Sequence, residues 1–239
     1  RWKLLLTQFC FKQPMHLIAL YKLYLVGSFF SVFLPGAIGG DIIRVGYSSD
    51  HYNLSLKKAG LIVLTERLCG LMAVLIMLFL GILYSPFIQH YLHIPIYYML
   101  CLLILFLLVI PFSIQFMLRR KIAINYKYML LLVLLSGIGQ AGDILAAYFF
   151  AQYFELNISF TDLLFVMPLV YIATVVPISL GGLGVREVSM VGLLAIFSVP
   201  SSTAVIMALL LYLVRILVGL IGLPCYLSIK MQTPKETQL

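Results

Sequence analysis

The chain has 239 residues, of which 63% are hydrophobic and only 10% are charged. Soluble domains carry about 25% charged residues, so this composition excludes an ordinary soluble protein and indicates an integral membrane protein. The net charge is +8, from 16 Lys and Arg against 8 Asp and Glu. In a membrane protein such an excess collects in cytoplasmic loops and against anionic head groups, so it predicts a membrane partner and no nucleic acid.

The first predicted element is an apolar segment over residues 15–34, which follows a basic start and ends at the sequence PGAIGG. Its uncharged part, residues 23–38, would cover about 24 Å as a helix, less than the ~30 Å of a hydrocarbon core. After a polar stretch, simple membrane spans are predicted over residues 60–84, 95–118, 128–154 and 204–229.

A second broken element lies between the third and fourth of these spans. Residues 163–180 are uncharged but contain Pro168 and Pro177, and they stop at the sequence GGLGVRE. Only a short apolar piece, residues 188–199, follows before the last span. Each broken element is therefore a pair of full spans or a re-entrant hairpin, and the short apolar halves favour hairpins.

The distribution of Lys and Arg orients the chain. Residues 1–22, 44–58, 119–127 and the C-terminal tail are basic, whereas residues 84–95 and 152–162 contain no Lys or Arg. The positive-inside rule then places both ends of the first broken element inside and both ends of the second outside. We predict an all-α, polytopic helical membrane protein with two re-entrant or broken helical hairpins in an inverted-topology repeat. It would be a multi-pass protein of the cell (inner) membrane with a cytoplasmic C-terminus.

The two breaks share the pattern P-x3-GG-x3-R. It is formed first by Pro35, Gly39, Gly40 and Arg44, and again by Pro177, Gly181, Gly182 and Arg186. Irregular backbone at membrane depth is tolerated only where it lines a cavity or is buried in protein, and paired broken helices surround the substrate site of many transporters. The amides that open each second half-helix suit an anion, and an Arg in that first turn adds a fork of donors that fits phosphate.

Two other readings of these residues stay open. The glycine pairs could serve close helix packing, which is common in membranes. The eight ionisable side chains predicted inside the membrane could all be satisfied as internal pairs: Asp41, Arg44, Glu66, Arg67, Asp143, Arg186, Glu187 and Arg215. Such groups are costly at this depth and are candidates for function. A substrate-binding role is therefore predicted for Asp41, Arg44, Glu66, Arg67, Arg186, Glu187 and Arg215, and for the glycines Gly39, Gly40, Gly181 and Gly182. Asp143 is either a proton or cation site or an interhelical contact.

The sequence predicts no catalytic residue, metal site or cofactor. His90 and His93 could form a metal pair, but the tyrosines around them favour an interfacial aromatic belt. The cysteines lack metal or disulfide spacing, which favours small buried residues: Cys10, Cys69, Cys101 and Cys225. The opening sequence RWKLLL has neither a Met nor a signal-peptide pattern, so we expect a single domain over residues 1–239 that is an N-terminally truncated fragment.

Three stretches, FLPGAIGGDIIR, TERLCGL and PISLGGLGVRE, resemble the transmembrane region of the lysylphosphatidylglycerol synthase/flippase family. The matching residues are Pro35, Gly36, Gly39, Gly40, Asp41, Arg44, Glu66, Arg67, Gly70, Pro177, Ser179, Gly181, Gly182, Gly184, Arg186 and Glu187. The resemblance implies a membrane protein that handles anionic or isoprenoid-linked lipids by moving them between leaflets. The soluble domain that transfers lysine is not seen, so the synthase activity is not implied.

Two classes of function follow. The first is a lipid flippase-like transporter for an anionic phospholipid or a polyprenyl-phosphate-linked lipid; it has no nucleotide-binding motif, so its transport would be downhill, ion-driven or dependent on a partner. The alternative is a membrane-embedded enzyme or an accessory subunit for sugar or aminoacyl transfer to a lipid carrier, with a glycosyltransferase or lipid synthase as partner. Asp41, Glu66 and Glu187 would be its acids and bases.

Overall fold

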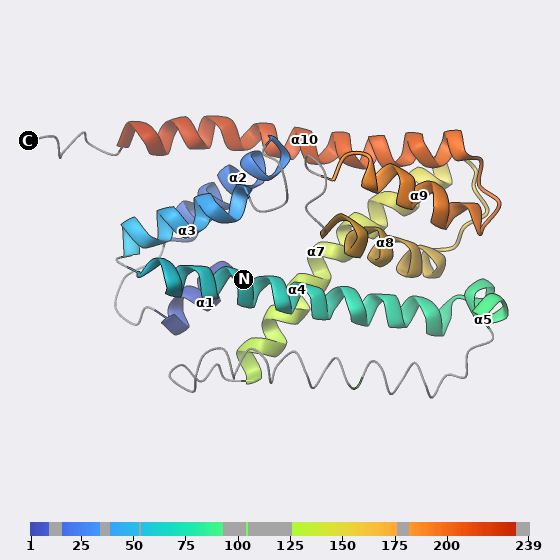
Figure 1. Ribbon diagram of the computed structural model, residues 1–239, viewed down its shortest axis with the longest axis horizontal. Coiled ribbons are helices and arrows are strands. Elements are labelled where there is room, and N and C mark those ends of the chain that lie inside the picture. Colours follow the sequence, from blue (N-terminus) through green and yellow to red (C-terminus); the bar gives the residue numbers. More distant parts are fainter. Residues whose placement is uncertain are drawn as a thin grey trace, which may run out of the picture.

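The computed structural model describes residues 1–9, 16–33, 39–52, 54–92, 104, 126–175 and 182–232. Its described elements are all helices (Figure 1): α1 (Trp2–Phe9), α2 (Leu17–Phe33), α3 (Gly39–Tyr52), α4 (Leu56–Tyr84), α5 (Pro86–Leu92), α7 (Tyr126–Tyr153), α8 (Phe160–Val175), α9 (Val185–Ala195) and α10 (Ser201–Gln232). The prediction of an all-α, polytopic fold is confirmed.

Three of the four predicted spans coincide with helices that are long and apolar enough to cross a membrane. These are Leu56–Tyr84, Lys127–Tyr153 and Ser201–Ser228. The fourth predicted span, residues 95–118, lies outside the described residues, as does the basic group at residues 119–121. The apolar surfaces of the three long helices are suited to lipid contact, so the chain is a multi-pass membrane protein.

Both broken elements are pairs of short helices. α2 packs against α3, and α8 packs against α9. At 17 and 16 residues, α2 and α8 are shorter than a membrane span. α8 continues through Pro168 and ends at Val175, before the GGLGVRE sequence at which the break is predicted.

The two pairs lie end to end between the two longest helices, α10 and α4 (Figure 1). Tyr212 of α10 contacts Arg186 of α9. About two turns further along α10, Gly219 contacts Val32 near the end of α2. Gly222 then contacts Leu25, which lies earlier in α2. The start of α9 and the end of α2 therefore approach each other near the middle of α10. The described helix ends on either side of the two breaks thus lie toward each other. The inverted-topology repeat itself stays a prediction.

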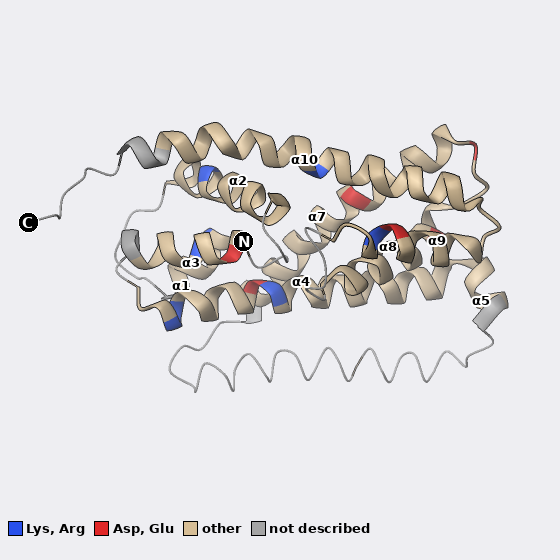
Figure 2. Ribbon diagram, turned by 45° about the horizontal axis from the view of Figure 1, so that its top comes forward, with Lys and Arg blue, Asp and Glu red and all other residues tan. Residues whose placement is uncertain are grey.

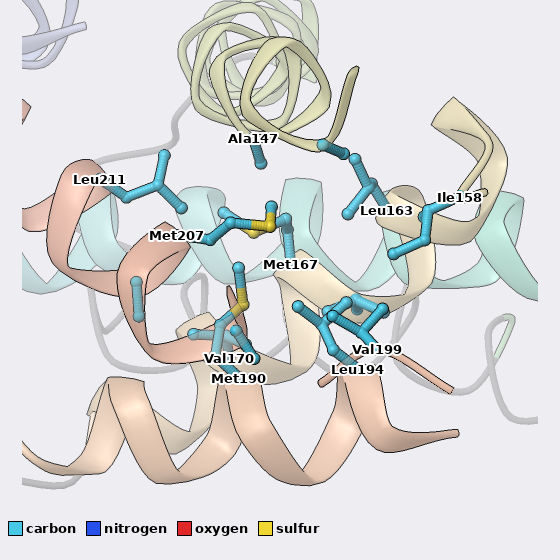
Figure 3. Packing of buried hydrophobic residues seen from close by; sticks show 14 of the residues in the cluster. Ala147, Ile158, Leu163, Met167, Val170, Met190, Leu194, Val199, Met207 and Leu211 are labelled. Atoms are coloured by element: carbon cyan, nitrogen blue, oxygen red, sulfur yellow. The ribbon is translucent and has the colours of Figure 1, made fainter. Parts of the chain in front are cut away.

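Apolar packing forms one cluster beside each helix pair. The first cluster joins α1, α2, α4 and α7, and it contains the buried Cys69. The second joins α7, α8, α9 and α10, where Met167, Met190 and Met207 meet (Figure 3). α4 and α7 contribute side chains to both clusters. The described polar side chains next to the two breaks, such as Arg44 and Arg186, lie around a cavity between the clusters.

A buried polar contact holds the far end of α4 against α8. Asp162, in the first turn of α8, accepts hydrogen bonds from the Ser85 hydroxyl at 2.5 Å and from the Ser159 amide at 2.9 Å. The Ser85 hydroxyl also accepts from the amide of Ile88 at 3.1 Å, which caps α5. The sequence around His90, predicted as a loop, is therefore a short helix that starts at a Ser-Pro pair.

Candidate functional site

A cavity of about 500 Å³ lies between the two helix pairs. Its wall includes residues of α2, α3, α4, α7, α8, α9 and α10. The polar members are Tyr24, Ser28, Ser31, Arg44, Arg67, Asp143, Thr174, Arg186, Tyr212 and Arg215. Figure 2 shows basic and acidic residues together on α3, α4 and α9, in contrast to the long uncharged stretches of α4 and α10. Among the described residues of this wall, four arginines stand against one carboxylate, so the cavity favours an anion.

Arg44 is held by carboxylates on two helices. Its Nη1 donates to Glu66 of α4 at 2.9 Å, and its Nη2 donates to Asp41, one turn earlier in α3. Asp41 also accepts from Arg67 of α4. The Arg44 guanidinium lies over the rings of Trp2 and Tyr24, at 5.2 and 5.1 Å from their centroids. These contacts fix α3 against α4 and balance the charges on this side of the cavity.

Arg186 is buried differently. The residue is 4% exposed, and its guanidinium lies 5.5 Å from the centroid of the Tyr212 ring. In the part of the chain that the structure describes, its Nη1 has no hydrogen-bond partner. Glu187, the next residue, accepts from the amide of Gly184 at 2.5 Å and so caps the start of α9. A cation with an unpartnered donor is thus present at the first turn of α9.

Asp143 and Arg215 connect α7 to α10 across the cavity. Arg215 Nη2 donates to Asp143 at 3.4 Å, and both side chains stay substantially exposed to the cavity, at 40% for Arg215 and 51% for Asp143. The interhelical contact, one of two interpretations of Asp143, is therefore present. Because it is a single long hydrogen bond between accessible groups, it holds neither partner firmly.

A second cavity of about 460 Å³ lies beside the first. The two share Tyr24, Arg44 and Arg67, so these side chains form the partition between them. On the far side of this partition, Arg1 donates to the Tyr24 hydroxyl at 2.7 Å and lies 3.5 Å from Glu66. The paired charges of α3 and α4 thus separate two hollow regions of the protein.

The two glycine pairs have different structural roles. A Cβ on Gly40 would overlap the carbonyl oxygen of Gly27 and the hydroxyl of Ser31, so Gly40 allows α2 and α3 to cross closely. Gly182 has a φ of +87°, which favours glycine, and it forms the turn before α9. The close-packing interpretation therefore fits Gly40, whereas Gly182 serves a turn.

The structure brings most of the predicted site residues together. Arg44, Arg67, Gly182, Arg186 and Arg215 line the main cavity, and Asp41 and Glu66 bind its arginines. Gly39 begins α3 at the α2–α3 break. Glu187 is outside the cavity lining and caps α9 instead. Pro35, Gly36, Pro177, Ser179 and Gly181 lie outside the described residues.

One predicted feature is wrong, and some residues were not predicted. Arg186 is in the first turn of its helix, but α3 begins at Gly39, which places Arg44 in the second turn. Tyr24 and Tyr212, which lie against the two arginines, were not predicted as site residues. Tyr212 lies three residues before Arg215, a spacing that places both on one face of α10 and could have indicated it. Among the described residues, no group of three or more His, Cys, Asp or Glu could hold a metal ion.

The fold and the site define a polytopic helical membrane protein with two opposed pairs of broken helices around an arginine-lined cavity. The chain belongs to a specific family of this class: residues 1–222 match the model of the lysylphosphatidylglycerol synthase TM region. It is therefore a membrane protein of a family concerned with lipids. No curated protein and no solved structure matches the chain.

Proposed function

We propose that this protein moves an anionic lipid between the leaflets of the cell membrane, with the phosphate of the lipid in the main cavity and its chains in the bilayer. The observation that supports the proposal most is the cavity itself. Two segments that are far apart in the sequence, each ending in the same Gly-Gly and Arg pattern, contribute to one arginine-lined space of about 500 Å³. A guanidinium fits the oxygens of a phosphate, and broken helices surround the sites of many transporters.

The cargo would be an anionic phospholipid or a polyprenyl-phosphate-linked lipid. The excess of arginine on the cavity wall favours a negative head group over a zwitterionic one. Tyr24, Tyr212 and the hydroxyls of α2 would replace part of the water that a head group loses on entry. The C-terminus would be cytoplasmic, and a glycosyltransferase or lipid synthase would be the partner that supplies or uses the lipid.

Leaflet exchange in liposomes tests this function. The protein is reconstituted into phosphatidylcholine vesicles that contain a trace of head-group-intact, chain-labelled phosphatidylglycerol, and the label in the outer leaflet is quenched with dithionite. We expect the protein to speed loss of the protected half of the signal, and Arg186→Gln to reduce that rate. The proposal fails if the folded protein moves labelled phosphatidylglycerol no faster than protein-free vesicles do.

Two controls separate transport from leakage and from general damage. Chain-labelled phosphatidylcholine in the same vesicles reports exchange of a zwitterionic lipid, which we expect to be slower. Gly46→Ala changes a glycine of α3 that has no atoms within 4 Å of the added Cβ, so it should transport as the parent does.

A further inference from the structure

The two motif arginines differ in how their charge is satisfied. Arg44 donates to two carboxylates and lies between two aromatic rings, as described above. Arg186 is 4% exposed, and among the described residues its Nη1 atom has no hydrogen-bond partner. Burying a cation with unsatisfied donors costs free energy, so a protein retains such a group where a ligand completes it.

The carboxylates next to Arg186 in the sequence and across the cavity make their hydrogen bonds with other groups. Glu187 Oε2 accepts from the amide of Gly184, and Glu187 Oε1 is buried without a hydrogen-bond partner among the described residues. Asp143 accepts from Arg215 at 3.4 Å. Neither makes a hydrogen bond or an ion pair with Arg186 among the described contacts. The charge of Arg186 is therefore available to a group that enters the cavity.

The surroundings of Arg186 leave space for such a group. Gly182 carries no side chain, and a Cβ there would lie 3.7 Å from Arg186 Nη2 and 3.4 Å from Thr174. Arg215 lines the same cavity from α10, and its bond to Asp143 is long enough for a stronger acceptor to replace it. Arg186 also lies in the first turn of α9, where the helix dipole favours an anion.

On the α3 side of the cavity, the described arginines are already paired with carboxylates. Asp41 and Glu66 accept from the two terminal nitrogens of Arg44, and Asp41 also accepts from Nε of Arg67, whose side chain is 40% exposed. An anion could reach Arg44 only by displacing carboxylates that are themselves buried, with 9% and 5% of their side chains exposed. That exchange would leave a negative charge buried without its partner.

We infer that the cavity contains an oxyanion subsite on its α9–α10 wall, formed by Arg186 and Arg215, and that Arg44 maintains the charge balance between α3 and α4 instead of binding the ligand. The ligand is a phosphate group, either of a lipid head group or of a soluble phosphate. Its assignment to a lipid rests on the proposed function, but the subsite is defined by the two arginines alone. The sequence predicts that both Arg44 and Arg186 bind the ligand, and this inference keeps that role for Arg186 alone of the two.

Binding to the purified protein in detergent tests this inference without transport. The probes are dihexanoyl phosphatidylglycerol below its micelle concentration and inorganic phosphate, and the readouts are calorimetric affinity and the shift of the thermal midpoint. The variants are Arg186→Gln, Arg186→Lys and the paired change Arg44→Gln with Glu66→Gln, which removes one cation and one anion together. Arg186→Lys keeps the charge but loses the fork of donors.

We expect Arg186→Gln to weaken binding at least about tenfold, the effect of losing a charge-assisted hydrogen bond. Without ligand, its thermal midpoint should equal or exceed that of the parent, because the lost group has an unpartnered donor. Arg186→Lys should bind with intermediate affinity. The Arg44 and Glu66 pair variant should keep the parent affinity.

The inference is overturned if the paired variant loses as much affinity as Arg186→Gln, or if Arg186→Gln lowers the ligand-free midpoint as removal of a structural cation would. It is also overturned if neither probe binds the parent. Binding of the lipid alone identifies a head-group site, and equal binding of inorganic phosphate identifies a soluble phosphate. If binding behaves as expected while leaflet exchange does not occur, the transport function is wrong and the subsite is correct.

Discussion

Glu66 of α4 and Arg44 of α3 form an ion pair at 2.9 Å, and both side chains are largely buried, with 5% and 13% exposed. The pair joins the first broken element to a long spanning helix. It also lies in the partition between the two cavities. Its removal is therefore expected to affect stability before it affects any ligand.

Glu66→Gln should destabilise the protein because it leaves Arg44 buried with one carboxylate instead of two. Breaking a buried pair from one side typically costs about 3–5 kcal/mol, and the second partner, Asp41, should keep the loss toward the lower end. Thermal unfolding in detergent measures the loss. Glu155→Gln is the matched control, since Glu155 is an exposed carboxylate in the loop after α7. Equal midpoints for the two variants would contradict the expectation.

Gly40→Ala should separate α2 from α3. The new Cβ would overlap the backbone of Gly27, and a helix backbone cannot yield as the end of a flexible side chain can. We expect a cost of roughly 1–3 kcal/mol in the free energy of unfolding. Gly46→Ala, in the same helix but with open space around it, should instead stabilise by up to about 1 kcal/mol through helix propensity. Stabilisation by both substitutions would show that the two helices do not cross closely.

Asp162→Ala should loosen the contact between α8 and the end of α4. The substitution removes the acceptor for the Ser85 hydroxyl and for the Ser159 amide, and it leaves Ser85 buried without that partner. Each unsatisfied buried group costs about 1–3 kcal/mol, so the total should be clearly measurable by thermal unfolding. Ser228→Ala is a control, because its hydroxyl bonds only to the carbonyl of Cys225 within α10. A larger loss from Ser228→Ala would contradict the role of Asp162.

The two helix pairs should enter the membrane from opposite sides. Lys57 lies exposed in the first turn of α4, just beyond the α2–α3 pair, and Asn157 lies exposed in the loop before the α8–α9 pair. In a variant without the four natural cysteines, Asn157→Cys should react with a membrane-impermeant maleimide on intact cells. Lys57→Cys should react only after permeabilisation, because the basic loops are expected inside. Labelling of both from one side would rule out the inverted arrangement.

The sequence predicted the helices that depend on length and hydropathy. The spans in α4, α7 and α10 could be predicted because an apolar run of this length crosses the lipid bilayer as a helix, in which all backbone groups are hydrogen-bonded. The broken elements were found because Pro and paired glycines interrupt short apolar runs. The helix α1 at residues 2–9 was not predicted, because a short basic and apolar stretch has no distinctive period.

The partners of the charged residues could not be predicted from the sequence. Arg44 and Arg186 occupy the same position in the P-x3-GG-x3-R pattern, yet among the described residues Arg44 forms ion pairs with carboxylates and Arg186 forms none. The difference depends on Glu66 of α4, 22 residues after Arg44, and on the hydrogen bond that Glu187 accepts from the amide of Gly184. Both contacts depend on how the helices pack, and the spacing of residues in the sequence does not show that packing.

The apolar clusters described above lie on either side of the cavity, and α4 and α7 are the helices that contribute to both. The middle of the molecule holds charge pairs and open space, and the two clusters are joined there by the backbones of α4 and α7 and by the packing of α2 on α10. Local opening follows contiguous packed units. Hydrogen exchange along α4 and α7 should therefore divide each helix into two protected blocks, with faster exchange at the level of the arginines. A helix that is continuous in its backbone would then belong to two independently melting halves of the protein.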